Sequence, residues 1–317
     1  MNTYKSILDA VKAFDTIIIH RHKSPDGDAL GSQIGLKHLL LENFPGKAVY
    51  MVGDHAGRYA FMKDSEMDDI PDEVFKNALS ILLDSSAKHL ISDDRYTLSK
   101  FTCRIDHHLF VEKIADMEYV DSTSESCAGL IVQMAIDNGL TLNETAASAL
   151  YTGMATDSGR FRYDSTNGNT MRRAAFLLDQ KIDISKIYRN LYVSDFDQLL
   201  LRARYTLKIQ FTEKRVAYII TTYDELKETK ADIFAISRGM VGIMSDIKGV
   251  DIWANFTETE TGVLCELRSD KYNINPIAVK YGGGGHKKAS GATLKNMDEA
   301  KRMLSDLDAL LGGPEPS

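Results

Sequence analysis

The side chains with the clearest chemical use lie in two short stretches of the 317-residue sequence. The first has the spacing His22-x3-Asp26-x-Asp28, and the second is the run Asp106-His107-His108. Each stretch follows an apolar run of the kind that forms a buried strand. Carboxylate and imidazole groups are the ligands that hard and borderline divalent cations take in proteins. The two stretches therefore indicate a metal-dependent hydrolase.

Both stretches also have simpler interpretations. Asp26-Gly27 is a common turn pair, and Asp28 could be the N-cap of a helix that begins at Ala29. The adjacent histidines could lie in a surface loop, although paired imidazoles at the end of an apolar strand are costly to bury without a use. Three potential ligands so close together in the first stretch favour the metal interpretation.

Two further aspartates lie at the ends of predicted elements. Asp84 closes the apolar run of residues 79–83, a position that by itself is more typical of a cap. Asp157 follows the helical pattern of residues 143–156, where the helix dipole disfavours an anion. A carboxylate at such a position indicates a cation nearby.

These residues need elements that bring them together, and the first half of the chain supplies an α/β pattern. Short apolar runs alternate with helical segments, which predicts a parallel sheet with helices on both faces. Ligands of such sheets gather at the carboxyl ends of the strands, where the candidate residues are expected. The predicted strands are residues 16–20, 48–52, 79–84 and 101–106, with a helix over residues 29–42.

The second half of the chain predicts a helical region and then a second α/β domain. We expect a catalytic domain over residues 1–194, a helical connector over 195–211 and a smaller α/β domain over 212–313, with a cleft between the two domains. The remaining predicted helices are residues 126–139, 143–156, 169–180, 195–207 and 297–311, and the remaining strands are 215–221, 251–256 and 262–267. Residues 312–317 are expected to form a frayed tail.

Composition limits the class of protein. Hydrophobic residues at 44% and charged residues at 26% are typical of a globular protein, which excludes fibrous and disordered chains. A net charge of −7 argues against binding long nucleic acid duplexes. The three cysteines lack CxxC spacing, and no apolar run approaches the roughly 18 residues of a membrane span. We therefore expect a cytoplasmic protein that does not associate with membranes.

The motifs, taken in order, resemble those of the DHH phosphoesterase superfamily over nearly the whole chain. Within it the sequence is most similar to the nanoRNase and pAp-phosphatase group, which has a DHH-associated C-terminal domain. The matching segments are His22 with Pro25-Asp26-Gly27-Asp28-Ala29-Leu30-Gly31-Ser32, Asp84, Asp106-His107-His108, Thr156-Asp157-Ser158-Gly159-Arg160-Phe161, and the glycine-rich segment 281–292. One departure is that the segment after Asp84 lacks the arginine commonly found there in the family.

The resemblance implies a site with two divalent ions, most commonly Mn²⁺. His22 and Asp26 would hold one ion, the second would be held by Asp28, His107 and Asp157, and Asp84 would bridge both. The resemblance also implies that Asp106 orients an imidazole and that His108 faces the scissile phosphate. Two ions about 3.5–4 Å apart would activate a hydroxide for attack on phosphorus. We expect His20, which lies inside the strand, to have a packing role.

The glycine-rich segment predicts a phosphate cradle in the second domain. Glycines allow backbone N–H groups to approach an anion closely, and charged side chains can add hydrogen bonds. The Arg-Ser pair at the end of the strand over residues 262–267 resembles the element that precedes this loop in the family. The predicted substrate-binding residues are Arg268, Ser269, Gly283, Gly284, Gly285 and His286.

The predicted activity is hydrolysis of short oligoribonucleotides to mononucleotides and dephosphorylation of adenosine 3′,5′-bisphosphate (pAp). Short oligonucleotides and nucleotides are thus the expected partners, and a homodimer is compatible with the sequence. The alternatives are a cyclic di-AMP or pApA phosphodiesterase, a pyrophosphatase, an exopolyphosphatase, and a nucleotide sensor without turnover. A sensor would be expected to lack a ligand, whereas every ligand position is filled here.

Overall fold

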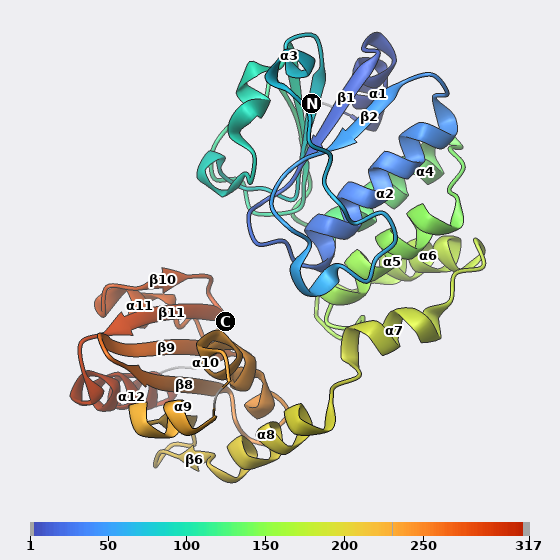
Figure 1. Cartoon of the computed structure of the whole chain (residues 1–317). Helices are drawn as coiled ribbons and strands as arrows, with labels where there is room; N and C mark the ends of the chain where they lie inside the picture. The colour runs from blue at the N-terminus through green and yellow to red at the C-terminus, as the bar shows by residue number, and fades with distance from the viewer. Residues whose placement is uncertain (1–2, 230, 313–317) are drawn as a thin grey trace. The chain divides into compact units, whose positions relative to one another are not determined.

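The computed structural model describes residues 3–229 and 231–312, and the chain forms two compact units, residues 1–193 and 194–317 (Figure 1). The first unit contains every predicted metal ligand, and the second contains the glycine-rich segment. Of the predicted tail, residues 313–317 lie outside the described residues. None of the described helices is long and apolar enough to cross a membrane.

The sheet of the first unit is parallel throughout and, over the described residues, has five strands in the order β2-β1-β3-β4-β5. The chain passes from β1 outward to β2 and then returns to the other side of β1 to form β3. The strand order therefore reverses between β1 and β3, and such a switch point is where α/β sheets bind ligands. The strands are β1 (Thr16–His20), β2 (Ala48–Met51), β3 (Leu79–Leu83), β4 (Phe101–Asp106) and β5 (Met117–Val120).

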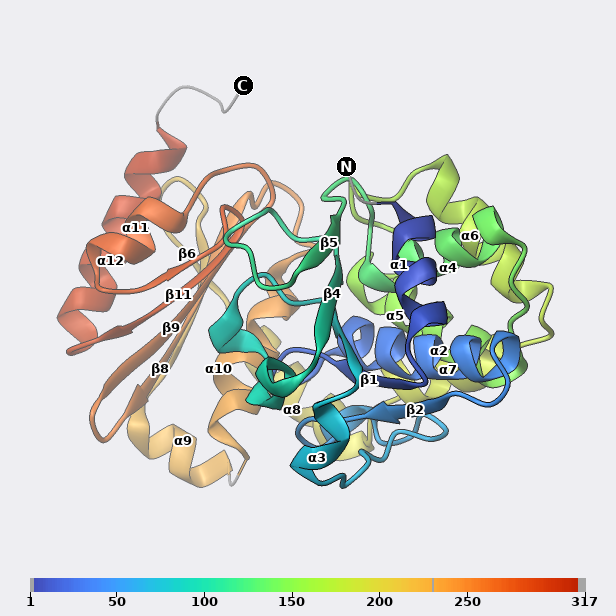
Figure 2. The ribbon, with the colours of Figure 1, turned by 90° about the horizontal axis from the view of Figure 1, so that it is seen from above.

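Alternate residues of β1 pack in two different cores. Ile17 and Ile19 pack in the large core with α1, α2, α4 and α5, which Figure 2 shows together on one side of the sheet. Ile18 faces the opposite way and packs with Phe75 of α3 in a smaller cluster. Helices thus cover both faces of the sheet, as the continuous apolar strands predicted.

Side-chain caps fix where the helices of the first unit begin. Thr3, Asp26, Ser126, Asn143, Asn167 and Asp183 each accept a hydrogen bond from a first-turn backbone N–H of the helix that follows. These helices are α1 (Tyr4–Ala13), α2 (Gly27–Asn43), α4 (Cys127–Asn138), α5 (Glu144–Asp157), α6 (Gly168–Leu178) and α7 (Ile184–Tyr192); the short α3 spans Asp72–Phe75.

Glycines allow the helices α2, α4 and α5 to pack closely. A Cβ at Gly31 of α2 would collide with the carbonyl oxygen of Ala149 on α5. A Cβ at Gly153 of α5 would lie 2.8 Å from Cβ of Ala128 and 2.9 Å from Oδ1 of Asp28. This close packing brings the start of α2, the start of α4 and the end of α5 to one place beside the sheet.

The second unit has a mixed sheet that, in its described part, has six strands in the order β10-β11-β9-β8-β7-β6. Only β7 and β8 pair in parallel, and the glycine-rich segment forms part of a hairpin between β10 and β11. The strands are β6 (Gln210–Phe211), β7 (Ala217–Thr221), β8 (Ile252–Thr259), β9 (Gly262–Ser269), β10 (Gly284–Gly285) and β11 (Ala289–Leu294). The helices are α8 (Phe196–Leu207), α9 (Tyr223–Thr229), α10 (Ile233–Val241), α11 (Asn275–Lys280) and α12 (Met297–Leu311).

Two apolar clusters lie on the sheet of the second unit. One contains Phe256 with Met303 of α12, and the other contains Ile219 with Tyr205 of α8. The helix α8, expected to be part of a connector, therefore buries Tyr205 in the core of this unit.

Candidate metal centre

The loop after β1 begins the site, and Asp26 is the residue that caps the following helix. Its Oδ1 accepts hydrogen bonds from the backbone N–H groups of Asp28 and Ala29, both at 2.9 Å. The helix α2 thus begins at Gly27, two residues earlier than predicted, and the N-cap is Asp26 rather than Asp28. Nε2 of His22 lies 3.8 Å from Oδ1 of Asp26.

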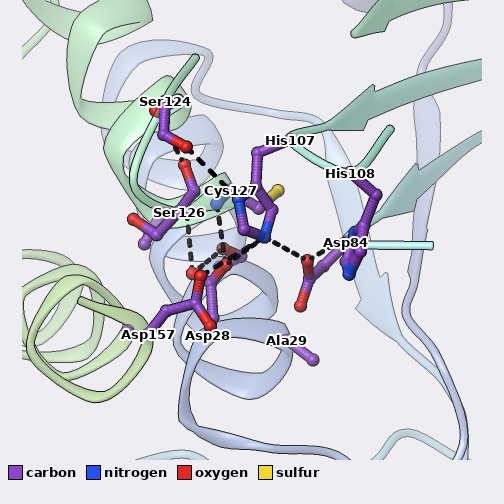
Figure 3. Close-up of polar contacts among 12 residues, drawn as sticks. Asp28, Ala29, Asp84, His107, His108, Ser124, Ser126, Cys127 and Asp157 are labelled. Atoms are coloured by element: carbon purple, nitrogen blue, oxygen red, sulfur yellow. Dashed lines mark hydrogen bonds and ion pairs between the residues drawn. The ribbon is translucent and has the colours of Figure 1, made fainter. Parts of the chain in front are cut away.

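Asp28 is almost completely buried, at 1% exposure, and points at the start of α4. Its Oδ2 accepts from the N–H of Cys127 at 2.7 Å, and its Oδ1 accepts from the N–H of Ala128 at 2.9 Å (Figure 3). The N-terminus of a helix carries partial positive charge, which partly compensates the buried carboxylate. Burial and the neighbouring Asp84 and Asp157 nevertheless raise the pKa of Asp28 well above its usual value.

Asp84 lies at the centre of the site, directly after β3. Its Oδ2 is 3.5 Å from Nε2 of His22, and its Oδ1 is 3.4 Å from Nε2 of His107 and 3.5 Å from Nδ1 of His108. Within the described residues, this buried Oδ1 has no hydrogen-bond partner. The backbone of Asp84 also has a φ of 49°, a left-handed conformation that is uncommon for residues other than glycine. Strain and an unpartnered oxygen at one buried residue indicate a functional position.

The two histidines of the second stretch have different partners. Nδ1 of His107 is 3.4 Å from the carbonyl oxygen of Ser124, so this nitrogen carries the proton and donates it. The other nitrogen, Nε2, is directed at the carboxylates of Asp28, Asp84 and Asp157. In contrast, His108 uses Nδ1 to contact Oδ1 of Asp106 at 2.7 Å. The expected orienting role of Asp106 thus has a direct contact to support it.

Asp157, the last residue of α5, completes the cluster. Its Oδ2 lies 3.4 Å from Nε2 of His107 (Figure 3). Burial raises the pKa of Asp157 to about 7, and the repulsion from Asp84 acts in the same direction. The backbone then turns through Gly159, Arg160 and Phe161, which all have positive φ values of 58–64°.

Three overlapping groups of ligand atoms result, and within each group the atoms lie no more than 4.8 Å apart. His22, Asp26 and Asp84 form one group, and the other two are Asp28 with His107 and Asp157, and Asp84 with His107 and His108. The geometry thus brings all of the predicted ligands together, from the segments after β1, β3 and β4, from the start of α2 and from the end of α5.

The charges of the cluster fit divalent cations. Burial lowers the pKa of His22 and of His107, but their contacts to Asp26 and Asp84 outweigh burial, and both pKa values rise to about 11. Burial likewise raises the pKa of Asp84, but the electrostatic contacts with the imidazoles of His107 and His22 outweigh burial and hold that pKa below its usual value. The neighbouring carboxylates of Asp28, Asp84 and Asp157 repel one another, and a bound cation would reduce this repulsion. The unpartnered Oδ1 of Asp84 together with this oxygen and nitrogen donor set suits metal ions.

Sequence reasoning missed two fully buried arginines that precede the ligands. Arg21 donates to Oε1 of Gln33 at 2.9 Å and to Oδ1 of Asp54 at 2.6 Å, and Oδ2 of Asp54 accepts from the N–H of Ser24 at 2.7 Å. These contacts fix the loop that carries His22.

Arg104 forms the second buried contact of this kind, an ion pair with Oδ2 of Asp106. The signal in the sequence was a cation inside or beside an apolar strand. His20 has the packing role expected of it, because it is buried between Phe75 and Tyr96 with Nε2 3.0 Å from Oγ of Ser80.

In the second unit the predicted substrate residues lie on β9 and the hairpin. Nη1 of Arg268 contacts Oε2 of Glu266 at 3.1 Å. The hydroxyl of Ser269 is used within the fold, since it donates to the carbonyl of Asp251 at 3.0 Å and accepts from the N–H of Tyr272 at 2.7 Å. These two hydrogen bonds give Ser269 a structural role, independent of the substrate contact that the sequence predicts.

The glycines allow the hairpin to pack closely on itself. A Cβ at Gly283 would collide with the carbonyl oxygen of Gly291, and its N–H donates to the carbonyl of Ala278 at 2.9 Å. The N–H of His286 donates to the carbonyl of Ala289 at 2.7 Å. Because these two N–H groups are occupied, they are not available for the anion binding that the glycine pattern predicts, whereas the side chain of His286 is exposed. Gly284 and Gly285 pair with β11 and are exposed.

Comparison with known proteins identifies the family. Residues 16–154 match the DHH family, N-terminal domain, and residues 223–313 match the DHHA1 domain. The chain is 36% identical to a probable bifunctional oligoribonuclease and PAP phosphatase NrnA of Streptococcus mutans, over 98% of this chain and 100% of that protein. It is 31% identical to the bifunctional oligoribonuclease and PAP phosphatase NrnA of Bacillus subtilis, over 96% and 97% of the two chains.

A solved structure is similar over the same length. The exopolyphosphatase-related protein of Bacteroides fragilis has a TM-score of 0.88 and 27% identity, and the match covers 98% of this chain and 97% of that one. The order of the motifs, the division into two units and these similarities all indicate the same family. The chain therefore belongs to the DHH family of phosphoesterases, among the two-domain DHH–DHHA1 proteins related to NrnA.

Proposed function

We propose that the chain hydrolyses short oligoribonucleotides to mononucleotides and removes phosphate from pAp. The observation that carries this proposal is the cluster centred on Asp84, which has the donor set of a binuclear metal hydrolase. The names of the relatives from Streptococcus mutans and Bacillus subtilis support the choice of substrates.

The ligand set proposed for two divalent ions, preferably Mn²⁺, follows the groups of the cluster. His22 and Asp26 would hold one ion, and Asp28, His107 and Asp157 would hold the other. Asp84 faces both groups and would serve both ions. Such ions, when bound, lower the pKa of a water molecule and neutralise charge on a phosphate.

His108 is proposed to bind the phosphate itself. Asp106 occupies Nδ1 of His108, which leaves Nε2 to contact a phosphate oxygen. Burial raises the pKa of Asp106, but the contacts with His108 and Arg104 outweigh burial and hold that pKa below its usual value. An ionised Asp106 keeps the ring of His108 oriented. Burial lowers the pKa of His108, but the contact with Asp106 outweighs burial and raises this pKa, which favours the charged ring.

The second unit is proposed to hold the rest of the substrate through Arg268, His286 and the glycine hairpin. Both side chains can donate to a phosphate, and the hairpin is exposed. A net charge of −7 disfavours long duplexes, which need many cationic contacts. Short substrates are thus the proposed class.

Two further properties are proposed, a cytoplasmic location and a homodimer. A cytoplasmic location fits the three cysteines, which are all free and buried. A homodimer stays a prediction, and light scattering of the purified protein at several concentrations would measure it.

The second candidate function is hydrolysis of polyphosphate or pyrophosphate, because the related structure from Bacteroides fragilis is described as exopolyphosphatase-related. The same metal cluster suits that chemistry. The cationic side chains of the second unit would then meet a chain of phosphates rather than a nucleotide.

A substrate panel tests the proposal. The purified protein would be incubated with Mn²⁺ or EDTA and with RNA of two to five nucleotides, pAp, pApA, cyclic di-AMP, pyrophosphate or polyphosphate, and the products would be separated by ion exchange. We expect Mn²⁺-dependent hydrolysis of the short RNA and of pAp. Hydrolysis of polyphosphate alone would favour the second candidate, and no hydrolysis of any substrate would contradict both. In the same assay, Asp84→Asn should lose turnover, and Asp94→Asn, at an exposed aspartate before β4, is its matched control.

A further inference from the structure

Three consecutive apolar residues lie exposed directly after His108. Leu109 is 75% exposed, Phe110 62% and Val111 65%. Single exposed apolar residues are common, but a contiguous group is typical of a surface that binds something. The position of this group, beside the histidine proposed to face phosphate, relates it to the substrate.

The loop that carries these residues is anchored at its base. Nη1 of the buried Arg104 donates to the carbonyl of Glu112 at 3.2 Å, and Oε1 of Glu112 accepts from the N–H of Lys88 at 2.9 Å. Farther along, Oε1 of Glu118 accepts from the N–H groups of Ile114 and Ala115 at 2.7 and 3.1 Å. The apolar tip is therefore presented by a fixed turn.

The ring of Phe110 has a cation beneath it. The guanidinium carbon of Arg104 lies 6.0 Å from the ring centroid, and Arg104 itself is fully buried. This contact holds one face of the ring toward the protein, while most of the ring's surface is exposed to solvent. A ring held in this way is a platform on which a flat group can stack.

The distance from the phosphate site suits a nucleotide. Phe110 is two residues from His108, so their Cα atoms are at most about 7 Å apart. A base that is joined to a bound phosphate through one ribose reaches a comparable distance. Aromatic side chains bind bases in this way with little regard to sequence, which fits an enzyme for short oligonucleotides.

We propose that Phe110 is a stacking platform for the nucleobase attached to the phosphate that His108 faces, with Leu109 and Val111 shielding its edges. The proposal rests on the proposed function and adds a base-binding residue in the first unit. A protein surface as the occupant is the competing outcome. The base is favoured because the only aromatic ring of the three residues is the one fixed over Arg104.

The test compares substrates with and without a base. Kinetics of Phe110→Ala, Phe110→Leu and Phe110→Tyr would be measured with pAp and with the abasic ribose 3,5-bisphosphate, both with Mn²⁺. We expect Phe110→Ala and Phe110→Leu to raise KM for pAp about tenfold, with Phe110→Tyr close to the parent. KM for the abasic substrate should be the same for the parent and for all three variants. Leu98→Ala, 43% exposed and located before the amino end of β4, is the matched control and should change neither KM.

Three results would overturn the platform. Equal losses on both substrates, or a Phe110→Leu variant as active as Phe110→Tyr, would mean that the loop packs on protein. No change in any variant would mean that the ring binds nothing.

If the parent protein hydrolyses neither substrate, the proposed function fails, and calorimetric binding of adenosine 5′-monophosphate against ribose 5-phosphate still tests the platform. Equal binding of these two ligands would contradict it.

Discussion

The metal cluster and the glycine hairpin are built in opposite ways. In the first unit the ligands Asp28 and Asp84 are 1% and 2% exposed, and contacts to helix starts and imidazoles fix them. In the second unit His286 and the strand β10 are exposed, and the hairpin is shaped mostly by its own backbone contacts. In the proposed function, this difference corresponds to a pre-organised reaction site and a more adaptable binding surface. Changes in the first should lower metal affinity and kcat, whereas changes in the second should raise KM.

The largest expected effect is that of Asp84→Asn. The change removes the charge that faces three imidazoles and, in the proposal, both ions. Loss of a residue that only supports a ligand costs about 10–100-fold in metal affinity, so we expect more than about 100-fold here, with loss of turnover. Calorimetric titration with Mn²⁺ measures the affinity. An Asp84→Asn protein with the affinity and kcat of the parent would contradict the role of this residue.

Arg104→Met and Arg268→Met compare the two units in stability. The pair of Arg104 and Asp106 is fully buried, and leaving one buried charge without its partner costs about 3–5 kcal/mol. Arg268 is 28% exposed, and its pair with Glu266 should contribute less than about 1 kcal/mol. Urea unfolding measures both. Equal losses of unfolding free energy for the two variants would mean that burial does not increase the contribution of the Arg104–Asp106 pair.

Arg268→Ala and His286→Ala should act on binding. We expect each to raise KM for pAp about tenfold, since a charge-assisted hydrogen bond is typically about 1.5–3 kcal/mol, while kcat changes little. Initial rates over a range of pAp concentrations separate the two constants. A fall in kcat with KM unchanged would place these residues in the reaction step instead.

The pH dependence of metal binding tests the protons that the ligands carry. In the metal-free protein, the pKa values of His22 and His107 are raised to about 11 because their acidic partners outweigh burial, so both rings carry protons at neutral pH. A metal ion needs neutral imidazoles and must displace these protons. Affinity for Mn²⁺ should therefore rise between pH 6 and 8. Calorimetry in buffers of different ionisation enthalpy would detect the released protons, and an affinity that is independent of pH would argue against the ligand set.

Much of the first unit could be predicted from the sequence, because its strands are continuous apolar runs and its ligands follow them directly. Strands β1, β3 and β4 and the residues at their ends are confirmed in position. The strand β5 was missed because all four of its residues are only partly buried, so the apolar signal is weak. The start of α2 was misplaced because Asp26 and Asp28 are both good caps, and only the fold determines which one points at the helix.

The supporting contacts were harder to predict. Arg21 pairs with Asp54, which is 33 residues away along the chain, so no local pattern marks that pair. Arg104 pairs with Asp106 only two residues on, and its one local signal was a cation inside an apolar strand. In the second unit, a glycine run gives no strand signal, so the hairpin of β10 and β11 and the internal use of its N–H groups emerged only from the fold.

The most direct test of the central claim is a crystal of this protein soaked in Mn²⁺ and measured for anomalous scattering. The account predicts two peaks about 3.5–4 Å apart, one beside His22 and Asp26 and one beside Asp28, His107 and Asp157, with Asp84 in contact with both. Manganese peaks elsewhere on the chain, with none within this cluster, would contradict it.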